Sequence, residues 1–164
     1  AKFKLSVAED KTRLIEFGKR NYQRCQRNET KASTFNFLGF THYYGKSRKG
    51  LVIAWHKTAK DNLRRKIKMM KEWLRAARVK ASFNEWIPIL RLKLIGHYNY
   101  FGISGNYRCL RQYYRKVTSL IFKWLNRRSD KKSVTRSTFR NYLQFMPLPM
   151  PRIVVNLYTL EKTQ

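Results

Sequence analysis

The spacing of apolar residues divides the chain into a strand-like part and a helical part, which meet near residue 57. In the first part, apolar and polar residues alternate in short runs, at residues 3–7, 12–17, 35–44 and 51–56. The last two runs flank the turn GKSRKG and therefore predict an antiparallel hairpin. The polar residues 21–33 predict a loop.

Helical periodicity begins at Lys57, where apolar residues start to recur every three or four positions. Thr58 is expected to cap a first helix. The apolar face of this helix comprises Ala59, Leu63, Ile67, Met70, Leu74 and Ala77. A second helix is expected to start at the capping box of Ser82 and Glu85, and Pro88 should bend it or delay its start.

The rest of the chain predicts two more helices. Gly102 and Gly105 end the second helix, and Asn106 is expected to cap a third one that continues to about Arg128. A short fourth helix is predicted over residues 135–145. The prolines of PLPMP then force an extended segment, and residues 153–158 predict a last strand.

These elements predict an α+β fold. A short antiparallel β segment is followed by a three-helix bundle, a short C-terminal helix and an extended tail. The expected organisation is a β region over residues 1–56, a helical domain over residues 57–128 and a basic extension over residues 129–164.

Net charge narrows the choice of partner. The chain has 37 Lys and Arg residues against 9 Asp and Glu, a net charge of +28. Such a field attracts polyanions, so nucleic acid is the expected partner and an anionic membrane surface a weaker alternative. A disordered basic tail is excluded because 43% of the residues are hydrophobic and 15% are aromatic. No apolar run approaches the ~20 residues of a membrane span.

Part of this charge follows helical spacing. Lys60, Arg64, Lys68, Lys71, Arg75 and Arg78 repeat along the first predicted helix, about a quarter-turn from its apolar face. Acidic partners four residues away are almost absent, which favours phosphate contact over a merely solvated face. Further candidate contacts are Arg108, Arg111, Arg115, Arg127 and Arg128 on the third helix, and Lys46, Arg48 and Lys49 in the hairpin turn. The helix dipole offers a structural reason for the cations at that helix end.

Other residue chemistry favours binding over catalysis. Tyr98, Tyr100, Phe101, Tyr107, Tyr113 and Tyr114 lie among the cations, where they could stack on bases or fill the core. His97 is expected to be a hydrogen-bonded structural residue. The chain has no Walker-type loop, nucleophile elbow or two-metal carboxylate pair. Its two cysteines show no zinc spacing, so no metal site is predicted and a reducing, cytoplasmic compartment is expected.

Several short motifs, taken in order, suggest a family. They are KLSVAEDKTRLIEFG, FNFLGF, GKSRKG, a Lys/Arg-rich helix, LIGHYNYFGISGN, FKWLNRRS and PLPMPRI. Together they resemble the C-terminal half of group II intron reverse transcriptase/maturases, and the resemblance covers nearly the whole chain. Group II introns are mobile elements, and the family acts in RNA splicing and RNA-directed DNA synthesis. The resemblance favours a bacterial, or alternatively an organellar, protein.

The resemblance implies roles for particular residues. Lys11 would lie near the incoming nucleotide and protonate the pyrophosphate leaving group. Phe37, Leu38, Gly39 and Phe40 would form the primer-grip hairpin, with Gly39 allowing close approach of the primer backbone. Residues 57–128 would be the thumb, or maturase, domain that holds intron RNA and the RNA–DNA template–primer duplex. Target DNA would contact the basic extension.

The sequence also departs from the family pattern. The Tyr-x-Asp-Asp motif expected upstream of Lys4 is not in this sequence, nor are the fingers and first part of the palm. The resemblance therefore implies the nucleic-acid-binding part of a nucleotidyltransferase that is inactive by itself. No cofactor is expected in this chain, and Mg²⁺ is expected only in the full polymerase. The alternative is a free-standing basic helical RNA-binding or splicing-cofactor module.

Overall fold

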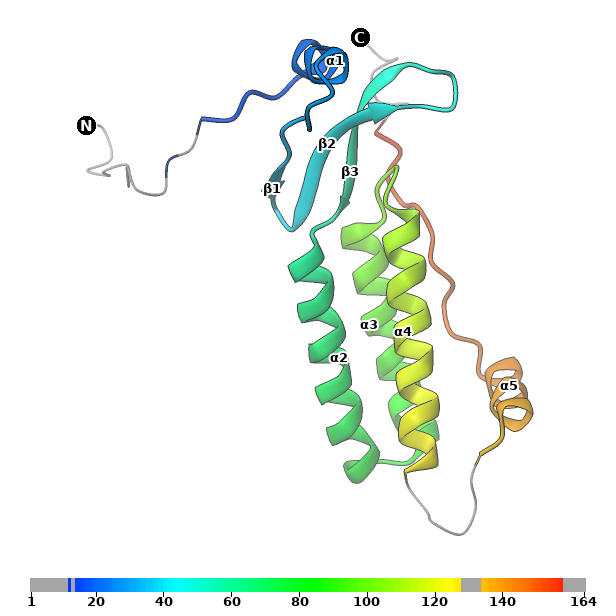
Figure 1. The fold of residues 1–164 in the computed structure, drawn as a ribbon. Coiled ribbons are helices and arrows are strands. Elements are labelled where there is room, and N and C mark those ends of the chain that lie inside the picture. Colours follow the sequence, from blue (N-terminus) through cyan, green and yellow to red (C-terminus); the bar gives the residue numbers. More distant parts are fainter. Residues whose placement is uncertain (1–11, 13, 128–133, 158–164) are drawn as a thin grey trace, which may run out of the picture.

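The computed structural model describes residues 12, 14–127 and 134–157. A three-stranded antiparallel sheet lies at one end of a bundle of long helices (Figure 1), which confirms the predicted α+β class. The elements in chain order are α1 (Lys19–Arg27), β1 (Phe35–Phe37), β2 (Phe40–Lys46), β3 (Val52–Thr58), α2 (Lys60–Lys80), α3 (Phe83–Phe101), α4 (Tyr107–Asn126) and α5 (Arg136–Phe145).

The sheet has the strand order β1-β2-β3. The β2–β3 ladder extends from Phe40 opposite Thr58, next to the bundle, to Lys46 opposite Val52 at the far tip. The predicted single run over residues 35–44 is wrong, because the chain reverses direction within it. Leu38 and Gly39 both have positive φ, 49° and 80°, as a two-residue hairpin turn of the primed type requires.

This β1–β2 turn is fastened to the bundle. The carbonyl of Gly39 accepts a hydrogen bond from the Ala59 amide at 2.9 Å, at the start of α2. The hydroxyl of Tyr100 on α3 donates to the Leu38 carbonyl at 3.0 Å. A Cβ at position 39 would displace the Asn62 side-chain amide, and the positive φ of this residue favours glycine.

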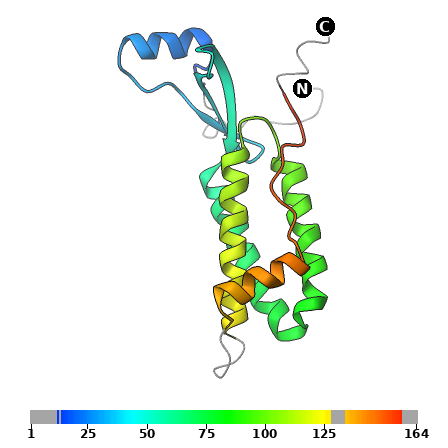
Figure 2. The same ribbon diagram turned by 90° about the vertical axis from the view of Figure 1, so that its right-hand side faces the viewer.

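The helices α2, α3 and α4 form a bundle in which α2 and α4 run side by side in the same direction and α3 lies behind them, antiparallel to both (Figures 1 and 2). The core is built from the apolar faces that the periodicity predicted. Its buried members include Leu63, Met70 and Leu74 of α2, Trp86, Ile87, Leu90 and Leu94 of α3, and Leu110, Tyr113, Val117, Ile121 and Trp124 of α4.

Two predictions about the N-terminal region and the first helix were wrong. Residues 21–33, predicted as a loop, contain most of α1. The very polar sequence of α1 concealed it: none of its residues is buried, and no side chain caps it. Thr58, predicted to cap the first helix, ends β3 instead, and α2 begins at Lys60.

The second predicted helix begins where the sequence predicted. The capping box of Ser82 and Glu85 is present, with the Ser82 amide donating to the Glu85 carboxylate at 2.6 Å. Pro88 lies inside α3 and does not delay it, since the helix is continuous from Phe83 to Phe101. The face that contains Pro88 is exposed, so its ring needs no room in the core.

The C-terminal segment returns along the bundle after α5 (Figure 2). Residues 147–151 have no regular secondary structure, as the prolines predicted. The amides of Val154 and Val155 donate to the Gly102 carbonyl at 2.6 and 3.0 Å. The prediction of a strand over residues 153–158 is wrong for residues 153–157. The pairing there is limited to one isolated bridge, between Ile103 and Val155. Residue 158 lies outside the described residues.

Asn106 joins the sheet to the bundle from the loop between α3 and α4. It occupies the N-cap position of α4 as predicted, but its side chain is fully buried and makes no capping hydrogen bond. Its Oδ1 accepts hydrogen bonds from the Thr58 amide at 2.8 Å and the Thr58 hydroxyl at 3.2 Å. Its Nδ2 donates to the Phe101 carbonyl and to the Thr58 hydroxyl, both at 2.8 Å. One amide group thus connects the end of β3 to the end of α3.

His97 is a core histidine of α3. Its ring stacks on Tyr113 of α4 with centroids 3.7 Å apart, and the residue is only 8% exposed. Burial, together with the nearby charge of Lys66, lowers the pKa of His97 to about 4. The imidazole is therefore neutral near pH 7.

Replacing Asn106 with leucine should lower the free energy of unfolding by roughly 2–5 kcal/mol, because the Thr58 amide and the Phe101 carbonyl lose their partner in a buried place. Urea denaturation of the wild-type and variant proteins measures this loss. Asn99→Ala, at an exposed position of the neighbouring helix, is the control and should change stability by less than about 0.5 kcal/mol. Equal small effects of both substitutions would contradict the role given to Asn106.

Lowering the pH should destabilise the fold partly through His97. Its pKa is 6.5 when unfolded and about 4 when folded, so the unfolded chain binds the extra proton. The contribution of His97 to the free energy of unfolding is therefore fully present above about pH 6.5. It is lost as pH falls toward 4, by up to about 3 kcal/mol. Urea titrations at several pH values should show a shallower loss for His97→Phe. An unchanged pH dependence in that variant would contradict the prediction.

Candidate nucleic-acid interface

The basic side of α2 is the first part of the candidate interface. Of the six cations predicted to line it, five are exposed and Arg78 is half-buried. One of them, Arg64, forms an ion pair with Asp61 at 3.7 Å, and both side chains are largely in solvent. Such an exposed pair contributes little to stability, and Asp61 offsets only one of the helix's positive charges.

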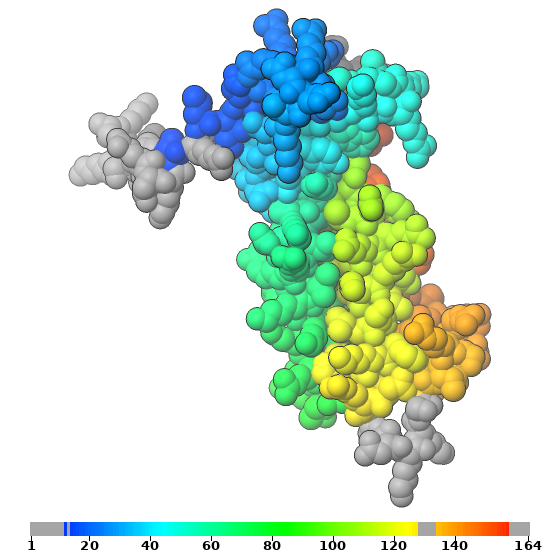
Figure 3. Space-filling model, viewed as in Figure 1, coloured from blue at the N-terminus to red at the C-terminus, as the bar shows by residue number. Residues whose placement is uncertain are grey.

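Helix α4 continues the basic surface. It contains no acidic residue, and Arg108, Arg111, Arg115 and Lys116 line a shallow depression along its outer side. Helices α2 and α4 pack side by side, so their exposed sides form adjoining surfaces (Figure 3). We call this surface the α2–α4 face. Its exposed cations are Lys60, Arg64, Lys68, Lys71, Arg75, Arg108, Arg111, Arg115, Lys116 and Lys123.

Arg78 and Arg127 have a packing role that the sequence did not specify. The guanidinium of Arg78 lies 4.7 Å from the centre of the Trp124 ring and donates a hydrogen bond to the Arg127 carbonyl at 3.1 Å. The guanidinium of Arg127 lies 5.5 Å from the same ring. These contacts join the end of α2 to the end of α4. The remaining predicted cation of this helix end, Arg128, lies outside the described residues.

The cations of the hairpin turn lie apart from the α2–α4 face. Lys46, Arg48 and Lys49 are exposed at the tip of the β2–β3 ladder, which is the end of the sheet away from the bundle. The Ser47 amide closes this turn by donating to the Leu51 carbonyl at 2.8 Å. The structure therefore does not bring these three residues together with the cations of α2.

A further basic element is α1, which sequence reasoning missed. It contributes Lys19, Arg20, Arg24 and Arg27, and it projects beyond the bundle on the side of α2 and α4 (Figure 2). One signal was present in the sequence: Arg20, Arg24 and Arg27 are spaced by four and three residues, as on one side of a helix. Arg24 is paired with Glu16.

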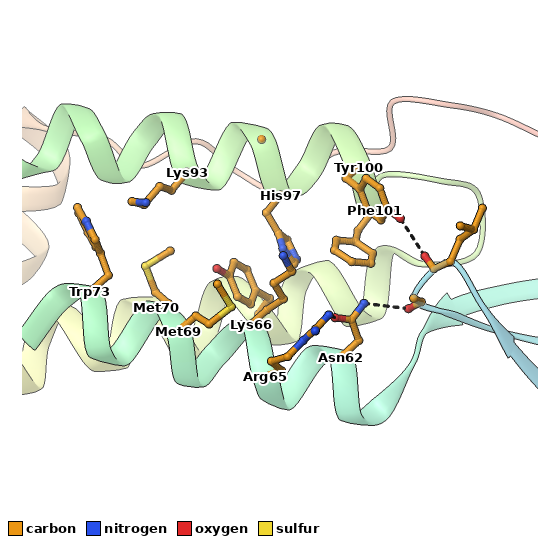
Figure 4. Close-up of a pocket in the computed structure, with 14 residues that line it drawn as sticks. Asn62, Arg65, Lys66, Met69, Met70, Trp73, Lys93, His97, Tyr100 and Phe101 are labelled. Carbon is orange, nitrogen blue, oxygen red and sulfur yellow. Dashed lines mark hydrogen bonds between the residues drawn. The ribbon is translucent and has the colours of Figure 1, made fainter.

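The predicted primer-grip residues lie at the junction of the sheet with the bundle. Phe40 is buried and stacks on Tyr100 with ring centroids 6.1 Å apart, whereas Phe37 and Leu38 are exposed. Leu38 and Gly39 form one end of a groove between α2 and α3 (Figure 4). Lys11, the predicted proton donor, lies outside the described residues.

This α2–α3 groove has a volume of about 730 Å³. Its lining combines apolar, aromatic and cationic side chains from both helices with the Tyr113 ring of α4. The lining residues besides the turn are Asn62, Arg65, Lys66, Met69, Met70, Trp73, Lys93, Gly96, His97, Tyr100, Phe101 and Tyr113. The sequence prediction did not identify this groove.

The structure separates the six candidate stacking rings by their exposure into three groups. Tyr98, Phe101 and Tyr113 are buried in the core, and burial raises the pKa of Tyr113 to about 12. Tyr114 is half-buried. Tyr100 and Tyr107 are 55% and 47% exposed, so a ligand can reach these two rings.

Two other features were sought among the residues that the structure describes. No group of three or more His, Cys, Asp or Glu side chains could hold a metal ion there. None of the helices in that part of the chain combines the length and apolar character needed to cross a membrane.

Comparisons with models of known protein families, with curated proteins and with solved structures gave no match for this chain.

Proposed function

We propose that this chain binds structured nucleic acid through the α2–α4 face, as the palm end and thumb of a group II intron reverse transcriptase/maturase. The binding proposal rests on the positive charge of that face. The face presents ten exposed cations, and α2 has two acids whereas α4 has none. Phosphate groups are the ligands that match an extended surface of one sign.

The dimensions of the face also favour a duplex over a small anion. Helix α2 has 21 residues and is therefore about 30 Å long. This length is comparable to one helical turn of a duplex, ~34 Å in B-form DNA, so cations along α2 and α4 can engage several phosphates of one backbone. The proposed ligands are intron RNA during splicing and the RNA–DNA template–primer duplex during DNA synthesis, with target DNA as a further one.

The family part of the proposal rests on the order of motifs and gains support from the β1–β2 turn. The residues that resemble a primer grip form a tight turn hydrogen-bonded to Ala59 at the start of α2 and to Tyr100 of α3. A primer-grip loop has to keep a fixed position relative to the thumb, and these contacts provide it. Nucleotide transfer, with its Mg²⁺, belongs in this proposal to the palm segment that contains the Tyr-x-Asp-Asp motif.

The reading frame upstream of Ala1 tests the family assignment. An in-frame segment encoding fingers, palm and a Tyr-x-Asp-Asp motif is the expected finding. A longer protein that includes this segment should extend a primer on an RNA template, measured by gel analysis of the products. A start codon and promoter directly ahead of the frame would favour the free-standing RNA-binding module and would contradict the assignment.

The binding surface is tested by replacing Arg64, Lys68 and Lys71 with alanine together. We expect weaker binding to an RNA duplex. The slope of log Kd plotted against log salt concentration should also become shallower by roughly 2–3, because each lost phosphate contact lowers this slope by about 0.9. Fluorescence anisotropy over a range of salt concentrations measures both. The thermal unfolding midpoint should remain nearly unchanged, since all three side chains are exposed.

A matched control removes the same charge elsewhere. Lys31, Arg91 and Arg152 are exposed residues outside the α2–α4 face, and their triple alanine variant should bind duplex more tightly than the α2 triple variant. Equal loss of affinity in both variants would mean that net charge alone governs binding. In that case the assignment of the interface to the α2–α4 face would be wrong.

A further inference from the structure

We propose that the α2–α3 groove holds one unstacked nucleotide of a single-stranded segment. Its base would lie over His97, and its flanking phosphates would contact Lys66 and Lys93. The inference rests on the proposed function, because it takes nucleic acid as the ligand. It assigns a second surface with a different specificity from that of the α2–α4 face.

The charges around the groove select an anion. Arg65 and Lys66 come from α2, and Lys93 comes from α3 on the opposite wall (Figure 4). None of the fourteen residues that line the groove is acidic. Cations on both sides of an open groove, without a counter-charge between them, match a ligand with phosphates on either side of a central group.

His97 supplies the polar contact in the middle. It is only 8% exposed, and its Nε2 has no hydrogen-bond partner in the structure. A buried polar atom without a partner costs free energy unless a ligand or water pairs with it. A neutral imidazole nitrogen can donate or accept a hydrogen bond, and the edge of a base offers both kinds of partner.

The rest of the lining suits a flat, partly apolar group. The Met69 side chain of α2 and the Tyr100 ring of α3 are more than half exposed. Trp73 lies further along α2, with the Lys93 ammonium 5.1 Å from its ring centre. Aromatic and thioether side chains stack on base faces irrespective of sequence. The volume of about 730 Å³ is within the usual range for small-molecule sites, so a single nucleotide fits.

The depth of the polar contact favours an unstacked base over a duplex. His97 lies between two packed helices and its Nε2 is shielded from solvent, so a single inserted base pairs with it only after side chains of the groove shift. Paired bases inside a duplex keep their edges engaged and their faces stacked, whereas single-stranded bases can turn outward. An apolar peptide segment would leave Lys66, Lys93 and His97 without partners, so it fits the groove less well.

Gly96 makes the groove testable without disturbing the fold. A Cβ built at this position has no neighbouring atom within 4 Å, and the residue faces the groove from α3. Leucine is also a better helix former than glycine. Gly96→Leu should therefore fold normally, which circular dichroism checks, and its side chain should occupy the space meant for the base.

The experiment compares two probes, a single-stranded uridine dodecamer and a twelve-base-pair RNA duplex, by fluorescence anisotropy. Gly96→Leu and the double variant Lys66→Gln/Lys93→Gln should each weaken dodecamer binding about tenfold and change duplex binding by less than about twofold. The double variant Lys116→Gln/Lys123→Gln, with the same charge change on the α2–α4 face, should weaken duplex binding more than dodecamer binding.

A second readout reports on the groove directly. The dodecamer should quench tryptophan fluorescence of the wild-type protein, and Trp73→Phe should remove most of that quenching. The inference is overturned if both groove variants bind the dodecamer like wild type, or if they lose duplex binding equally. Wild-type protein that binds neither probe would instead overturn the proposed function, so the two failures are distinguishable.

Discussion

The hydrogen bonds of Asn106 determine how the sheet and the helical bundle are arranged relative to each other. A short loop between α3 and α4 places this buried amide beside Thr58, where β3 gives way to α2. Because one side chain pairs with both the strand end and the Phe101 carbonyl, the sheet has little freedom to rotate about the single connection at Ala59. The fixed position of the β1–β2 turn at the head of the α2–α3 groove depends on this junction.

The molecule concentrates positive charge on helices that nevertheless pack side by side. Repulsion between the exposed cations of α2 and α4 opposes that packing, and the described residues include few acids to reduce it. Burial of apolar side chains between the helices offsets this repulsion: Leu74, Leu110 and Val117 are at most 1% exposed. A bound polyanion would remove the repulsion as well as add contacts, so ligand binding and folding stability are coupled.

Sequence periodicity predicted the parts of the fold that depend on one element at a time. The apolar and basic sides of α2 could be assigned because both repeat along a single helix. Leu38 and Gly39 concealed a turn, since a positive φ at leucine leaves no local signal, and α1 had too few apolar residues to be recognised. The α2–α3 groove and the partners of Asn106 could not be predicted, because they depend on how separate elements pack.

The hydrogen bonds of the C-terminal segment have a consequence for the order of folding. Val154 and Val155 pair with Gly102 near the sheet, although α5 lies at the opposite end of the bundle (Figure 1). On the ribosome, the sheet and the helices α2, α3 and α4 emerge and can associate before this segment is synthesised. Only then can the segment cover Gly102 and Ser104. Closure of the α3–α4 loop therefore follows the association of the sheet with α2, α3 and α4, because it awaits synthesis of a segment about fifty residues further along the chain.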